Sequence, residues 1–164
     1  MNKCDFSGWV IKTDLEYAGE RIIHQNAFAR DGGNTVPLLW IHGDYTRENM
    51  LGYAFLQNKD EGIYAYCMFN NTDTARRVKE LIRRGDICAL SVHATDVEQD
   101  HGVILRGSIK EVSLVLTGAD PGAFINCMDI QHGDDVATEA LIYTEMGVSR
   151  KHVDVPECSK LKGE

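Results

Sequence analysis

Two runs of the chain between residues 86 and 124 alternate apolar and polar side chains with a period of two, and each run predicts a β-strand. One face of the first strand would carry Ile87, Ala89, Ser91 and His93, and the other would carry Cys88, Leu90 and Val92. One face of the second would carry Ile109, Glu111, Ser113 and Val115, and the other Val112, Leu114 and Leu116. Each strand therefore has a face with polar residues that packing alone does not require.

The polar faces of these two strands meet if the strands pair as a hairpin. A turn through Glu98 to Gly102 would bring Glu111 across the sheet to within a few residues of Ser91. This arrangement would hold a hydroxyl and a carboxylate in one neighbourhood on rigid elements. We therefore expect the candidate chemistry of the chain in this hairpin.

Further strands are predicted before the hairpin. Residues Phe6 to Ile11 form an apolar run in which Gly8 indicates a bulge or a close approach of another backbone. Residues Val36 to Ile41 form a compact apolar strand that ends at His42. A second hairpin is predicted where two apolar runs flank a charged loop that ends in glycine, and its parts are Leu51 to Gln57, Asn58 to Gly62 and Ile63 to Phe69.

An amphipathic helix is predicted between these strands and the central hairpin. Asp73 is in position to cap it, and Gly85 is in position to end it. Its apolar stripe is Ala75, Val78, Leu81 and Ile82. Its outer face is basic, with Arg76, Arg77, Lys79, Arg83 and Arg84. Such a face is either a solvated surface or a docking surface for an acidic partner, and the pattern leaves both open.

The remaining helical patterns are short or lie near the C-terminus. Residues Ile22 to Arg30 predict one or two helical turns, and a second helix is predicted after Asp134 or Asp135. Residues Val148 to Glu164 predict a mobile tail, so the expected single domain is 1–147. At least six short strands and two helices indicate a β-rich α+β fold, either a barrel or a sandwich with helical cover.

Composition limits the classes of function. The chain has 164 residues and a formal net charge of -8, which disfavours nonspecific binding to nucleic acid. No run approaches the roughly 20 apolar residues of a membrane span, and the first residues, MNKCDFSGWVIKTD, lack the apolar core of a secretory signal. The cysteines form no CxxC pair, so we expect reduced thiols in a cytoplasmic protein.

Ser91 is the leading candidate for a nucleophile. A serine hydroxyl attacks a carbonyl efficiently only when a base within hydrogen-bond reach takes its proton. His42 is a candidate base and Glu111 a candidate to orient it, while His93 is a second candidate base on the same face as Ser91. Each residue also has an ordinary interpretation: Ser91 as a packing residue, His93 as a surface residue and Glu111 as a strand position that faces water.

The sequence contains residues for two other kinds of site. The residues that would serve a metal site are His24, His42, Asp44, His93 and His101, but they show no metal-site spacing, so no metal is expected. Residues Gly118 to Gly122 lack the lysine and the hydroxyl of a phosphate loop. Backbone N–H groups around Gly118 are instead candidate donors to a developing oxyanion.

Seven sequence motifs follow one another along the chain. They are SGWVI (Ser7 to Ile11), NAF (Asn26 to Phe28), VPLLWIHGD (Val36 to Asp44), LG (Leu51 and Gly52), DEGIYAY (Asp60 to Tyr66), ELIRRGDICALSVHA (Glu80 to Ala94) and GSIKEVSLVLTGADPGAFI (Gly107 to Ile125). Together they resemble the caudoviral prohead protease family, the capsid-maturation serine peptidases of tailed phages. The resemblance covers about three quarters of the chain and rests on several motifs rather than one.

This family is held to be related in fold to herpesvirus assemblin. The resemblance implies an antiparallel β-barrel of about six to seven strands covered by helices. It implies that Ser91 in ALSVH is the nucleophile, that His42 in WIHGD is the general base, and that Glu111 in KEVSLV takes the position of the second histidine of assemblin. Assemblin follows that position with paired arginines, whereas Thr117 to Pro121 contain none, so the oxyanion donors are expected near Gly118. No metal or organic cofactor is implied.

The resemblance also implies partners and a location. The substrates would be segments of the major capsid protein and the scaffold, and also the protease itself. The enzyme would be a homodimer or higher oligomer that contacts neither nucleic acid nor membrane, inside the immature capsid (prohead) in the host cytoplasm. The alternative is a non-catalytic β-barrel assembly or interaction module of the phage capsid, in which Ser91 and Glu111 are surface residues and the basic helix docks a partner.

Overall fold

The computed structural model describes residues 4–17, 21–43, 45–118, 120 and 122–128. Within these residues the chain forms nine strands, one α-helix and one short 3-10 helix. The strands are β1 (Phe6–Lys12), β2 (Glu16–Tyr17), β3 (Arg21–Ile23), β4 (Thr35–Trp40), β5 (Met50–Lys59), β6 (Gly62–Phe69), β7 (Ala89–Asp100), β8 (Val103–Val115) and β9 (Ile125–Met128). The helices are η1 (Ala29–Asp31) and α1 (Asp73–Arg83).

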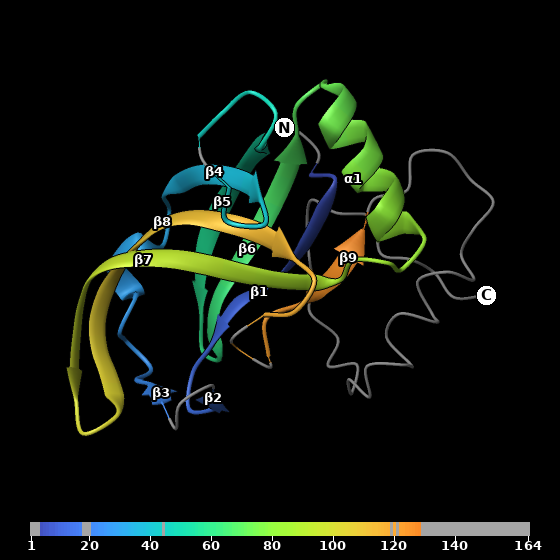
Figure 1. The fold of residues 1–164 in the computed structure, drawn as a ribbon. Coiled ribbons are helices and arrows are strands. Elements are labelled where there is room, and N and C mark those ends of the chain that lie inside the picture. Colours follow the sequence, from blue (N-terminus) through green and yellow to red (C-terminus); the bar gives the residue numbers. More distant parts are fainter. Residues whose placement is uncertain (1–3, 18–20, 44, 119, 121, 129–164) are drawn as a thin grey trace.

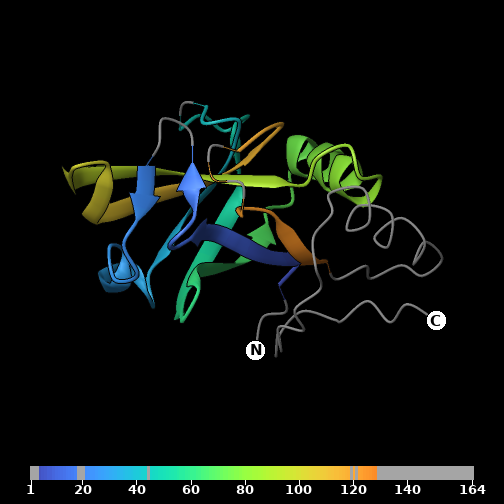
Figure 2. The same cartoon turned by 90° about the horizontal axis from the view of Figure 1, so that it is seen from below.

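All nine strands belong to one curled sheet (Figures 1 and 2). Its order is β2-β3-β8-β4-β5-β6-β1-β9, and β7 pairs with β8 outside this path. An isolated bridge between Ala89 and Phe124 joins the start of β7 to the residue before β9, so β7, which lies beside β8, approaches the β9 end of the strand order. The sheet therefore curls into a partly closed barrel, as the β-rich prediction requires.

The expectation of an antiparallel barrel is only partly right, because the sheet is mixed. β8 runs parallel to β3 and to β4, whereas the other strand pairs are antiparallel. The short strands β2 and β3 also raise the number of strands above the six or seven expected. The parallel pairing of β4 with β8 matters for function, since it places the end of β4 beside the middle of the central hairpin.

The central hairpin is the longest feature of the fold, and Figure 1 shows β7 and β8 crossing the molecule as one curved ribbon. Asp100 pairs with Val103, so the chain turns at His101 and Gly102, within the predicted region. Most of the predicted alternation is confirmed, because Leu90, Val92, Val112 and Leu114 all belong to the main core or pack against it. Three positions differ. Ile87, before the strand, and Ile109, next to an irregularity in the pairing, join the core, and Leu116 lies beyond the strand and is 71% exposed.

The second hairpin and the first strand are confirmed. β5 and β6 pair up to Lys59 and Gly62, which leaves a two-residue loop. Gly8 lies where another backbone approaches, because a Cβ on it would be 2.3 Å from the carbonyl oxygen of Phe124. Glycine is therefore required there by close packing of β1 against the segment that leads into β9.

Helix α1 packs against β5 and β6 with the predicted apolar stripe. Its N-cap is Thr72 rather than Asp73, because the Thr72 hydroxyl accepts the N–H of Ala75. Gly85 ends the helix with a φ of 81°, as expected. Four of the five basic residues on its outer face have acidic partners, and these pairs are Arg76 with Asp73, Lys79 with Asp5, Arg83 with Glu80, and Arg84 with Asp86.

Other predictions fail or fall outside the described residues. Residues Ile22 to Arg30 contain the end of β3 and part of η1 instead of α-helical turns. Cys4 is disulfide-bonded, which contradicts the expectation of reduced thiols throughout, while Cys67 and Cys88 are free. The second helix, the domain end at residue 147 and the tail 148–164 lie outside the described residues. Within the described part of the chain, no helix is long and apolar enough to span a membrane.

Candidate active site

The chain turns sharply where β4 ends. Ile41 and His42 both have a φ of 49°, and the N–H of Gly43 donates to the carbonyl of Trp40 at 3.0 Å. Positive φ at both central residues is the pattern of a type I′ turn, which normally uses Asn and Gly. A β-branched residue such as Ile41 is uncommon in this conformation and stores strain, which clusters at functional sites.

The turn brings the His42 ring to a buried carboxylate on the neighbouring strand. His42 Nδ1 lies 2.8 Å from Glu111 Oε1. Glu111 is 5% exposed, whereas the His42 side chain is 39% exposed. When Nδ1 carries the proton and donates it to Glu111, Nε2 is left with a lone pair that can accept a proton from a hydroxyl. In this state His42 can accept a proton at Nε2 while Glu111 fixes the orientation of its ring.

Two more side chains lie at the same carboxylate. The Ser113 hydroxyl donates to Glu111 Oε1 at 3.0 Å and accepts the backbone N–H of His42 at 3.3 Å. The Tyr45 hydroxyl lies near enough to Glu111 for the carboxylate to affect its pKa. Desolvation raises the pKa of Tyr45, and the charge of Glu111 raises it further. We call His42, Tyr45, Glu111 and Ser113 the Glu111 cluster.

Ser91 lies on β7, which pairs with β8 on the side opposite to β4 and His42. It pairs directly with Ser113 in the β7–β8 ladder, and directly paired side chains lie on the same face of a sheet. The Ser91 side chain is half-buried, and within the described residues its hydroxyl makes no hydrogen bond. The structure thus brings His42 and Glu111 into contact and sets Ser91 on the same sheet face, without a Ser91–His42 hydrogen bond.

His93 occupies the next position on this face. It pairs with Glu111 across the ladder, but its side chain is exposed and makes no hydrogen bond to that carboxylate. Of the two candidate bases, only His42 is bound to Glu111. His93 therefore remains a neighbour of the cluster.

The loop between β8 and β9 packs behind Ser91. A Cβ on Gly118 would lie 2.7 Å from the carbonyl oxygen of Leu90, and the N–H of Leu90 donates to Ala123 at 3.0 Å. The backbone at Gly118 therefore lies beside the residue that precedes Ser91. Glycine is needed for this approach. That backbone N–H groups near Gly118 donate to an oxyanion stays a prediction.

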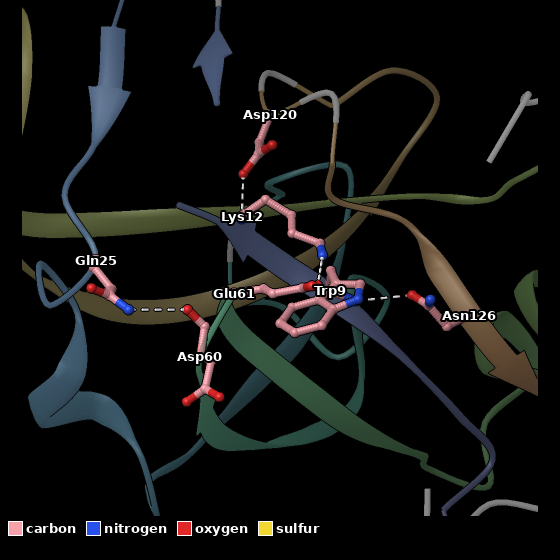
Figure 3. Close-up of polar contacts among 7 residues, drawn as sticks. All are labelled: Trp9, Lys12, Gln25, Asp60, Glu61, Asp120 and Asn126. Atoms are coloured by element: carbon pink, nitrogen blue, oxygen red, sulfur yellow. Dashed lines mark hydrogen bonds and ion pairs between the residues drawn. The ribbon is translucent and has the colours of Figure 1, made fainter. Parts of the chain in front are cut away.

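A buried aspartate ties this loop to β1, as Figure 3 shows. Asp120 is 8% exposed and accepts the backbone N–H groups of Lys12 at 2.7 Å and Gly122 at 2.8 Å. Burial raises the pKa of Asp120, although the two backbone hydrogen bonds and the Lys12 charge oppose the shift. Beside it, the Lys12 ammonium lies 3.9 Å from the centre of the Trp9 ring and pairs with Glu61 (Figure 3).

Other chemistries find little support among the described residues. No group of three or more His, Cys, Asp or Glu side chains there is arranged to hold a metal ion. Burial raises the pKa of the Cys67 thiol, with a further contribution from Asp5, so this cysteine is held as a neutral thiol. A cavity of about 460 Å³ lies apart from the Glu111 cluster, near Arg30, Asp96 and Arg106.

Comparisons with known proteins support the fold. No protein-family model and no curated protein sequence matches the chain. Among solved structures, the chain is similar to the protease of KSHV, a herpesvirus, in a complex with a hexapeptide phosphonate inhibitor. The TM-score is 0.55 at 11% sequence identity, and the match covers 94% of this chain and 81% of the viral one. The chain therefore has an assemblin-like fold.

Sequence reasoning did not assign a role to two members of the cluster. Alternation had already put Ser113 on the same face as Glu111, but nothing in the pattern showed that its hydroxyl would meet the backbone of His42. Tyr45 follows His42 in a segment without periodicity, so no sequence signal pointed to it. Both depend on the turn after β4.

Proposed function

We propose that this protein is a serine endopeptidase in which Ser91 is the nucleophile, His42 the general base and Glu111 the residue that orients the base. The observation that carries the proposal is the 2.8 Å contact between His42 Nδ1 and the buried Glu111 carboxylate, on the sheet face that also presents Ser91. The assemblin-like fold supports it, since the similar solved structure is a protease bound to a peptide-like inhibitor.

The proposed reaction proceeds in two stages. Ser91 Oγ attacks the carbonyl carbon of the scissile peptide while His42 Nε2 takes the hydroxyl proton, and the tetrahedral intermediate carries the negative charge on the former carbonyl oxygen. His42 then gives the proton to the leaving amine, the C–N bond breaks and an acyl-enzyme remains. In the second stage His42 takes a proton from water, whose oxygen attacks the ester, and Ser91 recovers its proton when the acid product leaves.

The proposal requires His42 and Ser91 to come within hydrogen-bond reach when substrate binds. Catalytic hydrogen bonds are often long in the absence of substrate and tighten in the complex. The His42 side chain is partly exposed and lies at the edge of the cluster, so its ring has room to turn. Backbone N–H groups near Gly118 are the proposed donors to the oxyanion.

The biological role that fits the sequence resemblance is more specific. We propose a phage prohead protease that cleaves segments of the scaffold and the major capsid protein, and itself, inside the immature capsid during maturation. Its proposed state is a homodimer or higher oligomer without metal or organic cofactor. This part rests on the ordered motifs from SGWVI to TGADPGAFI.

Co-expression tests both the proposed serine peptidase activity and the proposed role in capsid maturation. The full chain is produced together with its proposed substrates, the major capsid protein and the scaffold, as wild type, as Ser91→Ala and as Ser108→Ala. Ser108 is a matched control because it lies on β8 outside the Glu111 cluster. We expect cleaved capsid protein with wild type and Ser108→Ala, and intact capsid protein with Ser91→Ala. Full cleavage by Ser91→Ala contradicts the enzyme proposal.

The same experiment addresses the non-catalytic assembly module. That alternative predicts intact precursors and the same particles with wild type and with Ser91→Ala. It also needs a docking surface on α1, but most basic side chains there already have acidic partners. A charge-removing variant such as Arg77→Ala should therefore leave assembly unchanged, and a loss of assembly would favour the module.

A further inference from the structure

The Ser113 hydroxyl occupies a position between the candidate base and the candidate nucleophile. Ser113 is fully buried, at 0% exposure, in the middle of β8. On one side β8 pairs with β4, where Leu39 is its partner, and on the other side it pairs with β7, where Ser91 is its partner. A buried hydroxyl in an otherwise apolar stretch is costly unless its hydrogen bonds are satisfied.

The first hydrogen bond of the Ser113 hydroxyl is with the backbone N–H of His42, which the turn moves out of the strand ladder. The N–H of Ile41 still donates to Leu114 on β8 at 3.0 Å. At His42 the left-handed backbone turns away from β8, and its N–H finds the Ser113 hydroxyl at 3.3 Å instead of a ladder carbonyl. Ser113 therefore holds the backbone of the residue that carries the base.

The second bond follows from the first. A serine hydroxyl has one proton to donate, and at this site an N–H already points at its oxygen. Its own proton is therefore free to go to Glu111, whose Oε1 lies 3.0 Å away and also receives His42 Nδ1 at 2.8 Å. One hydroxyl thus fixes both the carboxylate and the backbone on which the ring is mounted.

We infer that Ser113 is a positioning residue that acts on the reaction through Glu111 and His42. This inference rests on the proposed function. Without the hydroxyl, the His42 N–H loses its acceptor and the Glu111 carboxylate can rotate away from the ring. The base would then be held less well, while the nucleophile and the fold would persist.

The test measures how fast a small fluorophosphonate labels the full chain, because this reagent reports the reactivity of an activated serine without a known substrate. We expect Ser113→Ala to lower the labelling rate constant about 10-fold or more, a part of the roughly 10²- to 10⁴-fold contribution of a general base. Ser7→Ala is the matched control, since Ser7 is also a 0% exposed serine with a hydrogen bond, to Tyr64, but lies on β1. It should label at the wild-type rate.

A double-mutant cycle separates positioning from general destabilisation. If Ser113 acts through Glu111, adding Ser113→Ala to Glu111→Gln should slow labelling by less than about 2-fold, because the two residues form one unit. An additive loss, or an unchanged rate in Ser113→Ala alone, overturns the inference. Should Ser113→Ala fail to fold, Ser113→Cys, which has similar size and only a weak donor, replaces it in the same cycle with the same expectations.

The outcomes distinguish this inference from the proposed function. A wild-type chain that is not labelled, or a Ser91→Ala chain that is labelled as fast as wild type, defeats the enzyme proposal and the inference with it. If labelling requires Ser91 but its rate is unchanged in Ser113→Ala, the proposed function stands and only the positioning role of Ser113 is overturned. Restored labelling in Ser113→Thr, which keeps the hydroxyl, would add support.

Discussion

Two buried carboxylates, one on β8 and one in the loop that follows it, are bound in opposite ways. Asp120 accepts two backbone N–H groups, those of Lys12 and Gly122. Glu111 is bound by side chains, the His42 ring and the Ser113 hydroxyl, with the Tyr45 hydroxyl nearby. Both are nearly inaccessible, at 8% and 5% exposure, so burial alone does not distinguish them.

The partners show what each carboxylate is for. Backbone donors cannot move a proton, so Asp120 serves to fasten the loop to β1. The imidazole bound to Glu111 is partly exposed and can exchange a proton with a bound substrate. A buried carboxylate is therefore a better sign of chemistry when its partner is a titratable side chain that reaches the surface.

The largest expected effect is the loss of the base. His42→Ala should lower the labelling or cleavage rate about 10²- to 10⁴-fold, the usual contribution of a general base. Its fold should be retained, because the ring is partly exposed. The matched control is His93→Ala, which removes the other histidine beside Glu111 and should leave the rate unchanged. Equal losses in both variants would remove the distinction between the two histidines.

Glu111→Gln is expected to come next, with a loss of about 10²-fold in rate. The amide keeps the shape of the carboxylate but carries no charge to stabilise the protonated ring. Thermal unfolding should show a folded protein, so the loss would be one of chemistry. A near-normal rate in this variant would mean that Glu111, like Asp120, has only a structural role.

Asp120→Asn should give the reverse of the Glu111→Gln result: a lower free energy of unfolding and an unchanged labelling rate. An amide has only one acceptor oxygen, so either the Lys12 or the Gly122 N–H loses its partner, at a cost of about 1–3 kcal/mol in the free energy of unfolding. Denaturant titration measures this loss. A labelling rate that falls as far as in Glu111→Gln, in protein that is still folded, would contradict the comparison.

The pH dependence of this loss sharpens the test. The folded pKa of Asp120 is raised above its ordinary value of 3.8, so the folded state binds the proton more tightly than the unfolded state. The wild type therefore loses the Asp120 contribution as the pH rises from 3.8 through the raised value, whereas the neutral Asn variant does not. The difference in unfolding free energy between the two should narrow as the pH rises across this window. A widening difference would mean that the backbone hydrogen bonds outweigh burial.

The smallest effect is expected at Tyr45. Tyr45→Phe removes a hydroxyl near Glu111 from an exposed ring, where solvent weakens the interaction, so the rate should fall only about 2- to 5-fold. The raised pKa of Tyr45 offers an independent readout, because its charge repulsion comes from Glu111. In Glu111→Gln, the pKa of Tyr45 measured by NMR should move part of the way back toward 10.0. An unmoved pKa would leave desolvation as the sole cause.

Local pattern predicted the central hairpin and the face on which Ser91, Glu111 and Ser113 lie, because side-chain alternation depends only on the strand itself. The approach of His42 is different. It depends on the parallel pairing of β4 with β8 and on a left-handed turn at Ile41 and His42 that propensity would not choose. The residue types made His42 a candidate base, but the strand pattern did not place it beside Glu111.

The sequence-based predictions that failed did so for similar physical reasons. Residues Ile22 to Arg30 have a mixed local pattern, and pairing of β3 with the distant strand β8 decides their structure. The role of Asp120 was not predicted, since its partners are backbone groups that carry no sequence signal. The helix start differed by one residue, because Thr72 and Asp73 are both good caps.

The central claim is that Ser91 is an activated nucleophile, and covalent labelling tests it most directly. The full-length chain is treated with a fluorophosphonate, and intact mass and peptide mapping locate the adduct. We predict one adduct on Ser91 in wild type and in Ser108→Ala, and none in Ser91→Ala. An unlabelled wild type, or an adduct that persists in Ser91→Ala, would contradict the account.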